Sequence, residues 1–596
     1  MSNPFEFRYP DDIRPNDVID LFVPVFGEYY NVPKSGHTFI NGARGSGKSM
    51  MFRYMKPDCQ SLVDSNGSPV SKPRRLKELD YFSLYIPIKK GHFDKTDIRL
   101  NDRHGEALLN EHYMVTQFAI IIFKEFEQLG FDNTKANLRQ LAKYYKDIFV
   151  KLIKYSGYDS TIEDTNFKNV TDVFTLIINI LKEVSKQFQH GYIKRLIGIS
   201  EPLPYNGPIL LYSEFLFELL SEFRKLDLMP DKPIFLLIDD ADELNVIQRK
   251  ILNSWVALRT SNEVSLKIST QLRYKIYSTI NGSRIDTPHD YSDVNLNDIY
   301  TTKKDLYYKR VHEIVTKRLE KYKFKETNPD SFFPPDEKQK AQIATLKNTY
   351  IQAKLKEGLS EKQAYDFAYR YSIPDYIKNL EGNRYSYSYS GFEQLVNISS
   401  GIIREFIDFA SEMFIAQVSE NTAKKIMAID PRIQDKEIKR YSDRKIESDF
   451  DKYRDESENK HDMDKLRHLI MGMGGLFKMI LHSNSSERRV FSIALNDEPD
   501  DELKGILELG VQHGYLQKSM IGNKYGTGKS RLFILNRILA PHFQLDPTSF
   551  AGYKFMDSST LKKSLIDHKR FLDLYRMKLK GIQSEEQKDL FGKNDE

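Results

Sequence analysis

The sequence predicts an α/β fold built on a parallel β-sheet, with helical insertions and further helical parts after the sheet. Three observations predict this fold. A short apolar segment, residues 37–40, runs into a glycine-rich loop, and a helix can begin directly after the loop at Met50. A second apolar run, residues 234–240, ends in two aspartates. Segments with helical periodicity fill the chain between them, as expected when helices cover both faces of a parallel sheet.

The glycine-rich loop matches a phosphate-binding motif. Residues 42–49 fit G-x-x-x-x-G-K-[ST] without a mismatch, and they lie between a strand and a helix, as the motif requires. Glycines let the backbone turn its N–H groups toward phosphate oxygens at the positive end of a helix. We expect Lys48 to contact the β- and γ-phosphates and the Ser49 hydroxyl to bind Mg²⁺. The alternative is a glycine-rich turn that matches by chance. The expected ATP-binding residues are Gly42, Ala43, Arg44, Gly45, Ser46, Gly47, Lys48, Ser49 and Met50.

The second apolar run ends in a pair of candidate acidic residues. The carboxyl end of a parallel strand is where α/β proteins place ligands. Asp239 is the candidate to hold Mg²⁺ through water, and Asp240 is the candidate to orient or deprotonate the attacking water. The alternative is structural, with Asp240 or Asp242 capping the helix that follows.

The next predicted strand, residues 265–271, carries two hydroxyl side chains near its end. Ser269 or Thr270 is expected to hydrogen-bond a γ-phosphate or the attacking water, and the alternative is a hydroxyl bonded to backbone. Arg273 and Arg284 follow in a polar loop. Either arginine fits an arginine finger that reaches a neighbouring subunit's nucleotide, and either fits a solvated surface charge.

The C-terminal third predicts a small domain with a basic hairpin. Residues 466–555 read as helix, strand, helix and hairpin, which is a winged helix-turn-helix pattern. Five bases and no acid occur between residues 515 and 545, which suits a wing that contacts phosphates. The alternative is a winged helix that binds protein. The expected contacts with duplex DNA are Lys518, Lys524, Lys529 and Arg531.

Two further segments stand out in this half of the chain. Residues 522–530 resemble a second phosphate loop, but five residues separate the glycines where the motif has four, and a strand follows. We therefore interpret them as the turn of the wing. Residues 385–389 alternate tyrosine and serine, and the sequence assigns no role to them.

Length and composition set the domain organisation. A chain of 596 residues exceeds one hydrophobic core, so three or more domains are expected. We predict an ATPase core over 1–300 with a helical insertion at about 100–225. A helical lid over 301–430, a charged linker over 431–465, the winged helix over 466–555 and a charged helical tail over 556–596 follow. The net charge of +5 is too small to indicate nucleic-acid binding by itself.

Composition also excludes several classes. The single cysteine, Cys59, excludes an internal disulfide framework and a cysteine-based zinc site, and it fits a reducing cytosol. No apolar run approaches the ~20 residues of a membrane span, and the first residues lack a signal peptide's apolar region. A cytoplasmic protein without a membrane partner is expected. No His/Asp/Glu cluster has nuclease or protease spacing, so a partner would carry out any nucleic-acid cleavage.

The order of the motifs resembles that of a known family. The segments are G-A-R-G-S-G-K-S, L-L-I-D-D-A-D-E-L, S-L-K-I-S-T-Q and S-S-G-I-I-R-E-F, followed by the winged-helix pattern. This order is similar to AAA+ ATPases of the origin-recognition initiator type, above all to bacterial relatives found in mobile or defence-associated gene sets. The resemblance implies that Lys48 and Ser49 form Walker A and that Asp239 forms Walker B. It also implies Ser269 or Thr270 as sensor 1, Arg404 in the lid as sensor 2, and a winged helix that grips DNA.

The sequence departs from the initiator pattern in two ways. Asp240 stands where initiators usually carry glutamate, and its side chain is one methylene shorter. Signalling ATPases of the STAND type often carry Asp-Asp there and act as slow switches. The helices between the two apolar runs also exceed what the initiator core needs. Two hypotheses follow: a DNA-engaging ATPase that acts as an oligomer or with a partner, and a nucleotide-gated scaffold with slow turnover and a protein-binding C-terminal domain.

Overall fold

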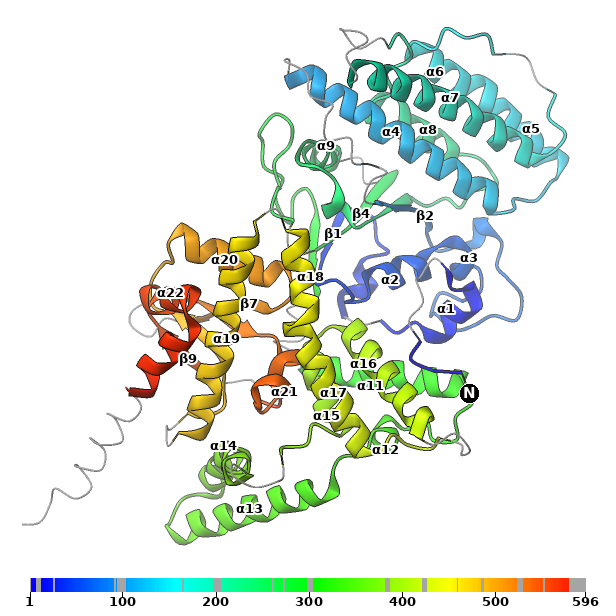
Figure 1. The fold of residues 1–596 in the computed structure, drawn as a ribbon. Coiled ribbons are helices and arrows are strands. Elements are labelled where there is room, and N and C mark those ends of the chain that lie inside the picture. The colour runs from blue at the N-terminus through cyan, green and yellow to red at the C-terminus, as the bar shows by residue number, and fades with distance from the viewer. Residues whose placement is uncertain are drawn as a thin grey trace, which may run out of the picture. The chain divides into compact units, whose positions relative to one another are not determined.

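The computed structural model divides the chain into two compact units (Figure 1). One unit comprises Arg8–Ile299, and the other comprises Met1–Phe7 together with Tyr300–Glu596. The residues that the structure describes are 2–6, 12–24, 27–89, 93, 103–162, 166–196, 205–259, 262–271, 274–296, 304–380, 386–420, 426–457, 459–483, 487–522, 529–549 and 552–577.

The unit Arg8–Ile299 is built on a five-stranded parallel sheet in the order β2-β3-β4-β1-β5. The strand β4 therefore lies between the strand that enters the glycine-rich loop and the strand that ends in the aspartates. The strands are β1 (Thr38–Asn41), β2 (Phe82–Pro87), β3 (Ile234–Asp239), β4 (Val264–Thr270) and β5 (Ser292–Asn295). The helices are α1 (Pro15–Leu21), α2 (Lys48–Met55), α3 (Pro57–Gln60), α4 (Arg103–Gln128), α5 (Lys135–Tyr144), α6 (Val150–Tyr155), α7 (Val170–Leu196), α8 (Phe217–Arg224) and α9 (Val246–Ala257).

Helices cover both faces of this sheet (Figure 1). On one face, Phe39, Leu84 and Ile268 belong to a single apolar core with Phe118 of α4 and Trp255 of α9. The helices α4 to α8 bury their apolar sides in this same core, so the inserted segment extends the sheet's own core. The other face lies against α2, where the Ser83 hydroxyl donates a hydrogen bond of 2.6 Å to the carbonyl of Met55. Side chains alternate between the two faces along each strand, so register decides which residues face α2.

The second unit is mostly helical and includes the first residues of the chain. The ring of Phe5 packs against Phe332 and Phe333, and Arg318 donates a hydrogen bond of 2.9 Å to the carbonyl of Pro4. The helices are α11 (Lys304–Lys321), α12 (Pro329–Phe332), α13 (Glu337–Lys356), α14 (Glu361–Leu380), α15 (Phe392–Ile398), α16 (Ile403–Glu420), α17 (Pro431–Ile446), α18 (Ser448–Glu456), α19 (Lys460–His482), α20 (Asp501–Gln512), α21 (Ala540–Phe543) and α22 (Ser558–Ile566). The prediction assigned the whole of 1–300 to the ATPase core, whereas residues 2–6 belong to this second unit.

The segment 431–465, interpreted from its charges as a solvated helix or linker, is helical and packed. It forms α17, α18 and the start of α19, and α17 buries Tyr441. Two basic residues of α17 pair with acids of α16: Lys445 lies 3.0 Å from Glu405, and Arg444 lies 2.7 Å from Glu412. Other ion pairs join residues within the segment itself. The high density of both charge signs therefore reflects ion pairs within and between packed helices.

A four-stranded sheet in the order β7-β8-β6-β9 forms the C-terminal part of this unit. Its strands are β6 (Val490–Leu495), β7 (Leu516–Gly522), β8 (Lys529–Leu535) and β9 (Gly552–Met556). Helix, strand, helix and hairpin occur in the predicted order, with one helix, α20, between β6 and β7. The strand β9, which pairs with β6 in parallel, was not predicted. Ser530 lies within β8, so no helix begins after it, in agreement with the wing interpretation.

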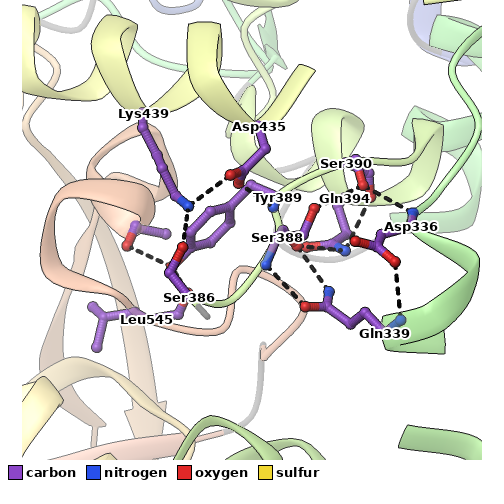
Figure 2. Close-up of polar contacts among 11 residues, drawn as sticks. Asp336, Gln339, Ser386, Ser388, Tyr389, Ser390, Gln394, Asp435, Lys439 and Leu545 are labelled. Atoms are coloured by element: carbon purple, nitrogen blue, oxygen red, sulfur yellow. Dashed lines mark hydrogen bonds and ion pairs between the residues drawn. The ribbon is translucent and has the colours of Figure 1, made fainter. Parts of the chain in front are cut away.

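The alternating tyrosines and serines form an extended strap, residues 386–391, that joins several elements of this unit (Figure 2). Gln339 of α13 accepts a hydrogen bond of 2.9 Å from the N–H of Ser388 and donates one of 2.8 Å to its carbonyl. Asp435 of α17 accepts from the N–H of Tyr389 at 2.8 Å, and the Tyr389 hydroxyl donates to the carbonyls of Ala540 and Leu545. The strap therefore holds α13 and α17 to the first residue of α21 and to Leu545, two residues beyond the end of that helix.

Candidate nucleotide-binding site

The loop between β1 and α2 has a backbone that only glycine adopts easily. Gly45 and Gly47 have φ angles of +87° and +102°, in the left-handed region. A Cβ atom at Gly42 would lie 2.8 Å from the Ser46 Oγ and 3.1 Å from the Leu296 Cβ, so a side chain has no room there. Gly47 is the residue that precedes α2, and the first turn of that helix therefore opens onto the loop.

Two polar side chains of the loop region, Ser46 and Lys48, are buried. Lys48 is buried, and its Nζ donates hydrogen bonds of 2.8 Å and 3.1 Å to the carbonyls of Gly42 and Ala43. Ser46 Oγ is buried and has no hydrogen-bond partner in the described part of the chain. An unpartnered buried hydroxyl beside helix N–H groups fits phosphate oxygens, which accept such donors. Arg44 is exposed, whereas Ser49 and Met50 are partly buried in the first turn of α2.

Asp239 lies at the carboxyl end of β3, where hydroxyl groups from both neighbouring strands bind it. Ser269 of β4 donates a hydrogen bond to Oδ1, and the hydroxyl of Tyr85 of β2 donates one of 3.0 Å to Oδ2. Asp239 is only 3% exposed. The sequence analysis missed Tyr85, because nothing in a single strand's sequence shows that β2 lies next to β3.

Asp240 has a left-handed backbone conformation, and the pKa of its carboxyl group is raised. Its φ is +56°, and its N–H donates a hydrogen bond of 3.0 Å to Ser269 Oγ. Burial, followed by the nearby Asp239, raises the pKa of Asp240 to about 6, although the charge of Lys48 opposes this shift. A partly buried acid with a pKa close to neutrality is suited to accept a proton from water.

The structural alternative for these aspartates, a helix cap, does not describe the structure. The helix α9 is capped by Asn245, whose side chain accepts from the N–H of Gln248 while Gln248 bonds back to the N–H of Asn245. Asp242 instead accepts a hydrogen bond of 3.0 Å from the N–H of Gln271, at the end of β4.

The two hydroxyl residues of β4 face opposite sides of the sheet. Ser269 lies on the α2 side, where it bridges Asp239 and the N–H of Asp240. Thr270 donates instead to Asn41 Oδ1, and Asn41 donates a hydrogen bond of 2.6 Å to Asp293 of β5. The structure therefore brings Ser269 to the aspartate pair and places Thr270 in a link between β4, β1 and β5.

The structure describes the three arginines predicted to assist catalysis to different extents. Arg273 falls outside the described residues. Arg284 follows β4 in a turn, with a side chain that is 78% exposed and 3.5 Å from Asp286. Arg404 lies in the first turn of α16, in the other unit, and its role as sensor 2 stays a prediction.

The hairpin of β7 and β8 groups its basic residues on one face. The register pairs Lys518 with Phe533, Met520 with Arg531 and Gly522 with Lys529. Directly paired residues point to the same side, so the three basic side chains share a face with Met520, which is 51% exposed. Arg531 also lies 2.8 Å from Glu498. Lys524 lies outside the described residues.

Arg537, the fifth base counted between residues 515 and 545, does not belong to this face of the hairpin. It is buried and donates a hydrogen bond of 2.6 Å to the carbonyl of Ser549.

Neither a metal-binding cluster nor a membrane-spanning helix occurs among the described residues. They contain no group of three or more His, Cys, Asp or Glu side chains that could hold a metal ion. This does not conflict with Mg²⁺ at Asp239 and Ser49, because Mg²⁺ is usually held by one or two protein groups, water and substrate phosphates. Among the same residues, no helix is both long enough and apolar enough to cross a bilayer.

The parallel sheet, the loop before α2 and the polar carboxyl edge together define a P-loop fold of the AAA+ ATPase class. A family model described as ORC-CDC6-like matches residues 3–555, and the chain belongs to this family. The match confirms the predicted resemblance and the predicted α/β fold. ORC/CDC6-like AAA+ proteins bind nucleotide, generally use ATP and Mg²⁺, and often oligomerise and bind DNA. A search of curated proteins found no match.

Proposed function

We propose that this protein binds Mg²⁺–ATP at the loop between β1 and α2, hydrolyses it, and couples the nucleotide state to DNA engagement or to partner assembly. The observation that carries this proposal is the group of Asp239, Asp240 and Ser269 at the carboxyl edge of the sheet, on the α2 side. Family membership supports it independently.

Each residue of the group has a role that follows from its chemistry. Lys48, which now bonds to loop carbonyls, offers its ammonium to the β- and γ-phosphates. Ser49 and Asp239 would hold Mg²⁺, which neutralises phosphate charge when bound. Asp240 accepts a proton from the attacking water. Ser269 donates to the Asp239 carboxylate and accepts from the backbone N–H of Asp240, so it holds both residues in place.

The ATPase proposal is tested by steady-state ATP turnover of the purified chain. We expect Asp239→Asn to lose turnover by about 100-fold or more, because the amide is a poor Mg²⁺ partner. The matched control is Asp286→Asn, which neutralises an exposed carboxyl of the same unit. Equal turnover in all three proteins would contradict the proposal.

We further propose that the wing face formed by Lys518, Lys529 and Arg531 contacts the phosphates of duplex DNA. This proposal is supported by the register of the hairpin, which puts the three basic side chains on one face. Each phosphate contact contributes about 0.9 to the slope of log affinity against log salt. A Lys518→Ala/Lys529→Ala variant should therefore lower that slope by nearly two, whereas Lys436→Ala, at an exposed lysine of α17, should not. An unchanged slope would favour a protein ligand for this domain.

One observation favours a second candidate, the slowly cycling signalling scaffold. Asp240 has a shorter side chain than glutamate, and burial raises its pKa. Tight nucleotide binding with negligible turnover, indifferent to DNA, would support this candidate. The resemblance also motivates proposals that copies of the chain oligomerise through Arg273 or Arg284 and that the protein serves anti-phage defence with an effector partner.

A further inference from the structure

Tyr85 makes a contact at the site that no sequence motif indicates. Its hydroxyl donates a hydrogen bond of 3.0 Å to Asp239 Oδ2, while Ser269 donates to Oδ1 of the same carboxylate. The two donors come from β2 and β4, the strands on either side of β3. Each oxygen of the Asp239 carboxylate therefore has one hydroxyl donor, and each keeps a lone pair for a further partner.

Strand register explains why a tyrosine makes this contact. Tyr85 pairs with Leu237, which lies two residues before Asp239 and so on the same face of the sheet. A long side chain is needed to reach from that position to the strand end. The ring lies near the end of α2, with Lys56 Nζ 5.6 Å from its centroid. Tyr85 is 7% exposed, so its hydroxyl has little access to water as an alternative partner.

We propose that Tyr85 is a positioning residue that sets the Mg²⁺ requirement of this site by fixing the orientation of the Asp239 carboxylate. The proposal rests on the proposed Mg²⁺–ATP function. A carboxylate that binds Mg²⁺ through water must present a lone pair in a defined direction, and loss of one donor lets it rotate about its terminal torsion. Groups that orient a metal-binding side chain typically change metal affinity by about 10- to 100-fold when removed.

The test compares Tyr85→Phe with the wild-type chain, using a fluorescent ATP analogue in EDTA and over a Mg²⁺ titration. We expect equal analogue binding in EDTA. We expect the Mg²⁺ concentration for half-maximal binding to rise about 10-fold in the variant. Tyr144→Phe is the matched control, because that buried hydroxyl donates a bond of 2.9 Å to the carbonyl of Leu219 in the inserted helices.

Turnover supplies a second readout that a purely structural role would not move. Saturating Mg²⁺ should restore most of the turnover of Tyr85→Phe, which separates the Mg²⁺ requirement from the maximal rate. An unchanged Mg²⁺ midpoint would overturn the inference, and so would weaker binding in EDTA by the same factor as in Mg²⁺. A wild-type chain that binds no nucleotide would instead overturn the proposed function, so the two failures are distinguishable.

Discussion

Two polar networks, one in each unit, use the same kinds of side chain for different ends. At the strap, Gln339 pairs with both backbone groups of Ser388, and the buried Tyr389 hydroxyl donates to two carbonyls. At the carboxyl edge of the parallel sheet, Ser46 Oγ has no partner in the described residues, and Asp240 has a raised pKa. The backbone groups named at the strap have protein partners, although the nearby Gln394 Oε1 is buried without one. What distinguishes the sheet edge is the combination of an unpartnered hydroxyl with an acid of raised pKa. This combination is therefore a better guide to function than an unpartnered polar atom alone.

The largest expected effect that separates the two networks is loss of hydrolysis without loss of folding. Asp240→Asn removes the proposed proton acceptor but keeps the shape of the side chain. We expect turnover to fall by about 100-fold or more, with ATP binding and thermal stability retained. Steady-state kinetics beside a binding titration provides the measurement, and turnover near the wild-type rate would move the proton acceptor elsewhere.

The two neighbouring hydroxyls of β4 provide a matched pair inside the sheet edge. Ser269→Ala removes a donor to Asp239 and an acceptor for the N–H of Asp240, so turnover should fall by about 10-fold or more. Thr270→Val removes only the bond to Asn41, which should cost about 1 kcal/mol of stability and leave turnover within a few fold. The opposite ranking in an ATPase assay would show that Thr270 is the residue that senses nucleotide.

At the strap, in contrast to the sheet edge, a substitution should lower stability and leave nucleotide binding unchanged. Gln339→Ala leaves the buried N–H of Ser388 without its partner and leaves the Ser388 carbonyl only the longer bond of 3.4 Å from Gln394. We expect the free energy of unfolding to fall by about 2 kcal/mol. Chemical denaturation would measure this loss, and ATP affinity should stay unchanged. A strap variant with wild-type stability and altered nucleotide affinity would remove the distinction between the networks.

The smallest expected effect is the pH dependence of kcat/KM. It tests the electrostatics of the sheet edge. Asp240 must be ionised to accept a proton, and its pKa of about 6 in the free protein should limit kcat/KM on the acid side. The rate constant should rise with pH up to about 6 and level off above it. The folded-state pKa exceeds the unfolded value of about 3.9, so this group's contribution to stability falls as pH rises between them. A profile that is flat from pH 5 to 8 would exclude Asp240 as the acceptor.

The sequence predicts those residues of the candidate site that belong to short motifs. It does not predict residues whose contacts depend on which strands are neighbours in the sheet. The glycines, Lys48 and the two aspartates were identifiable because the chemistry requires them at fixed spacing beside a strand end. Tyr85 could not be found, because its contact depends on strand order. The choice between Ser269 and Thr270 depends on which face of the sheet lies against α2, and that is a matter of register.

The same reasoning explains the differences in the second unit. Charge density in 431–465 predicted a solvated helix or linker, but two of its basic residues have their partners on α16, earlier in the chain. The alternating tyrosines and serines of the strap carry no motif, because their partners come from three separate elements. The strand β9 was not predicted, because a short edge strand is stabilised mainly by its pairing with a neighbour, here β6, and not by its own sequence.

The most direct measurement is ATP turnover of the purified protein with and without duplex DNA, beside the Lys48→Ala variant. We expect Mg²⁺-dependent turnover that rises when DNA is added and is lost in Lys48→Ala, because Lys48 is the residue proposed to contact the β- and γ-phosphates. Turnover that persists in Lys48→Ala would contradict the assignment of the nucleotide site to the loop between β1 and α2.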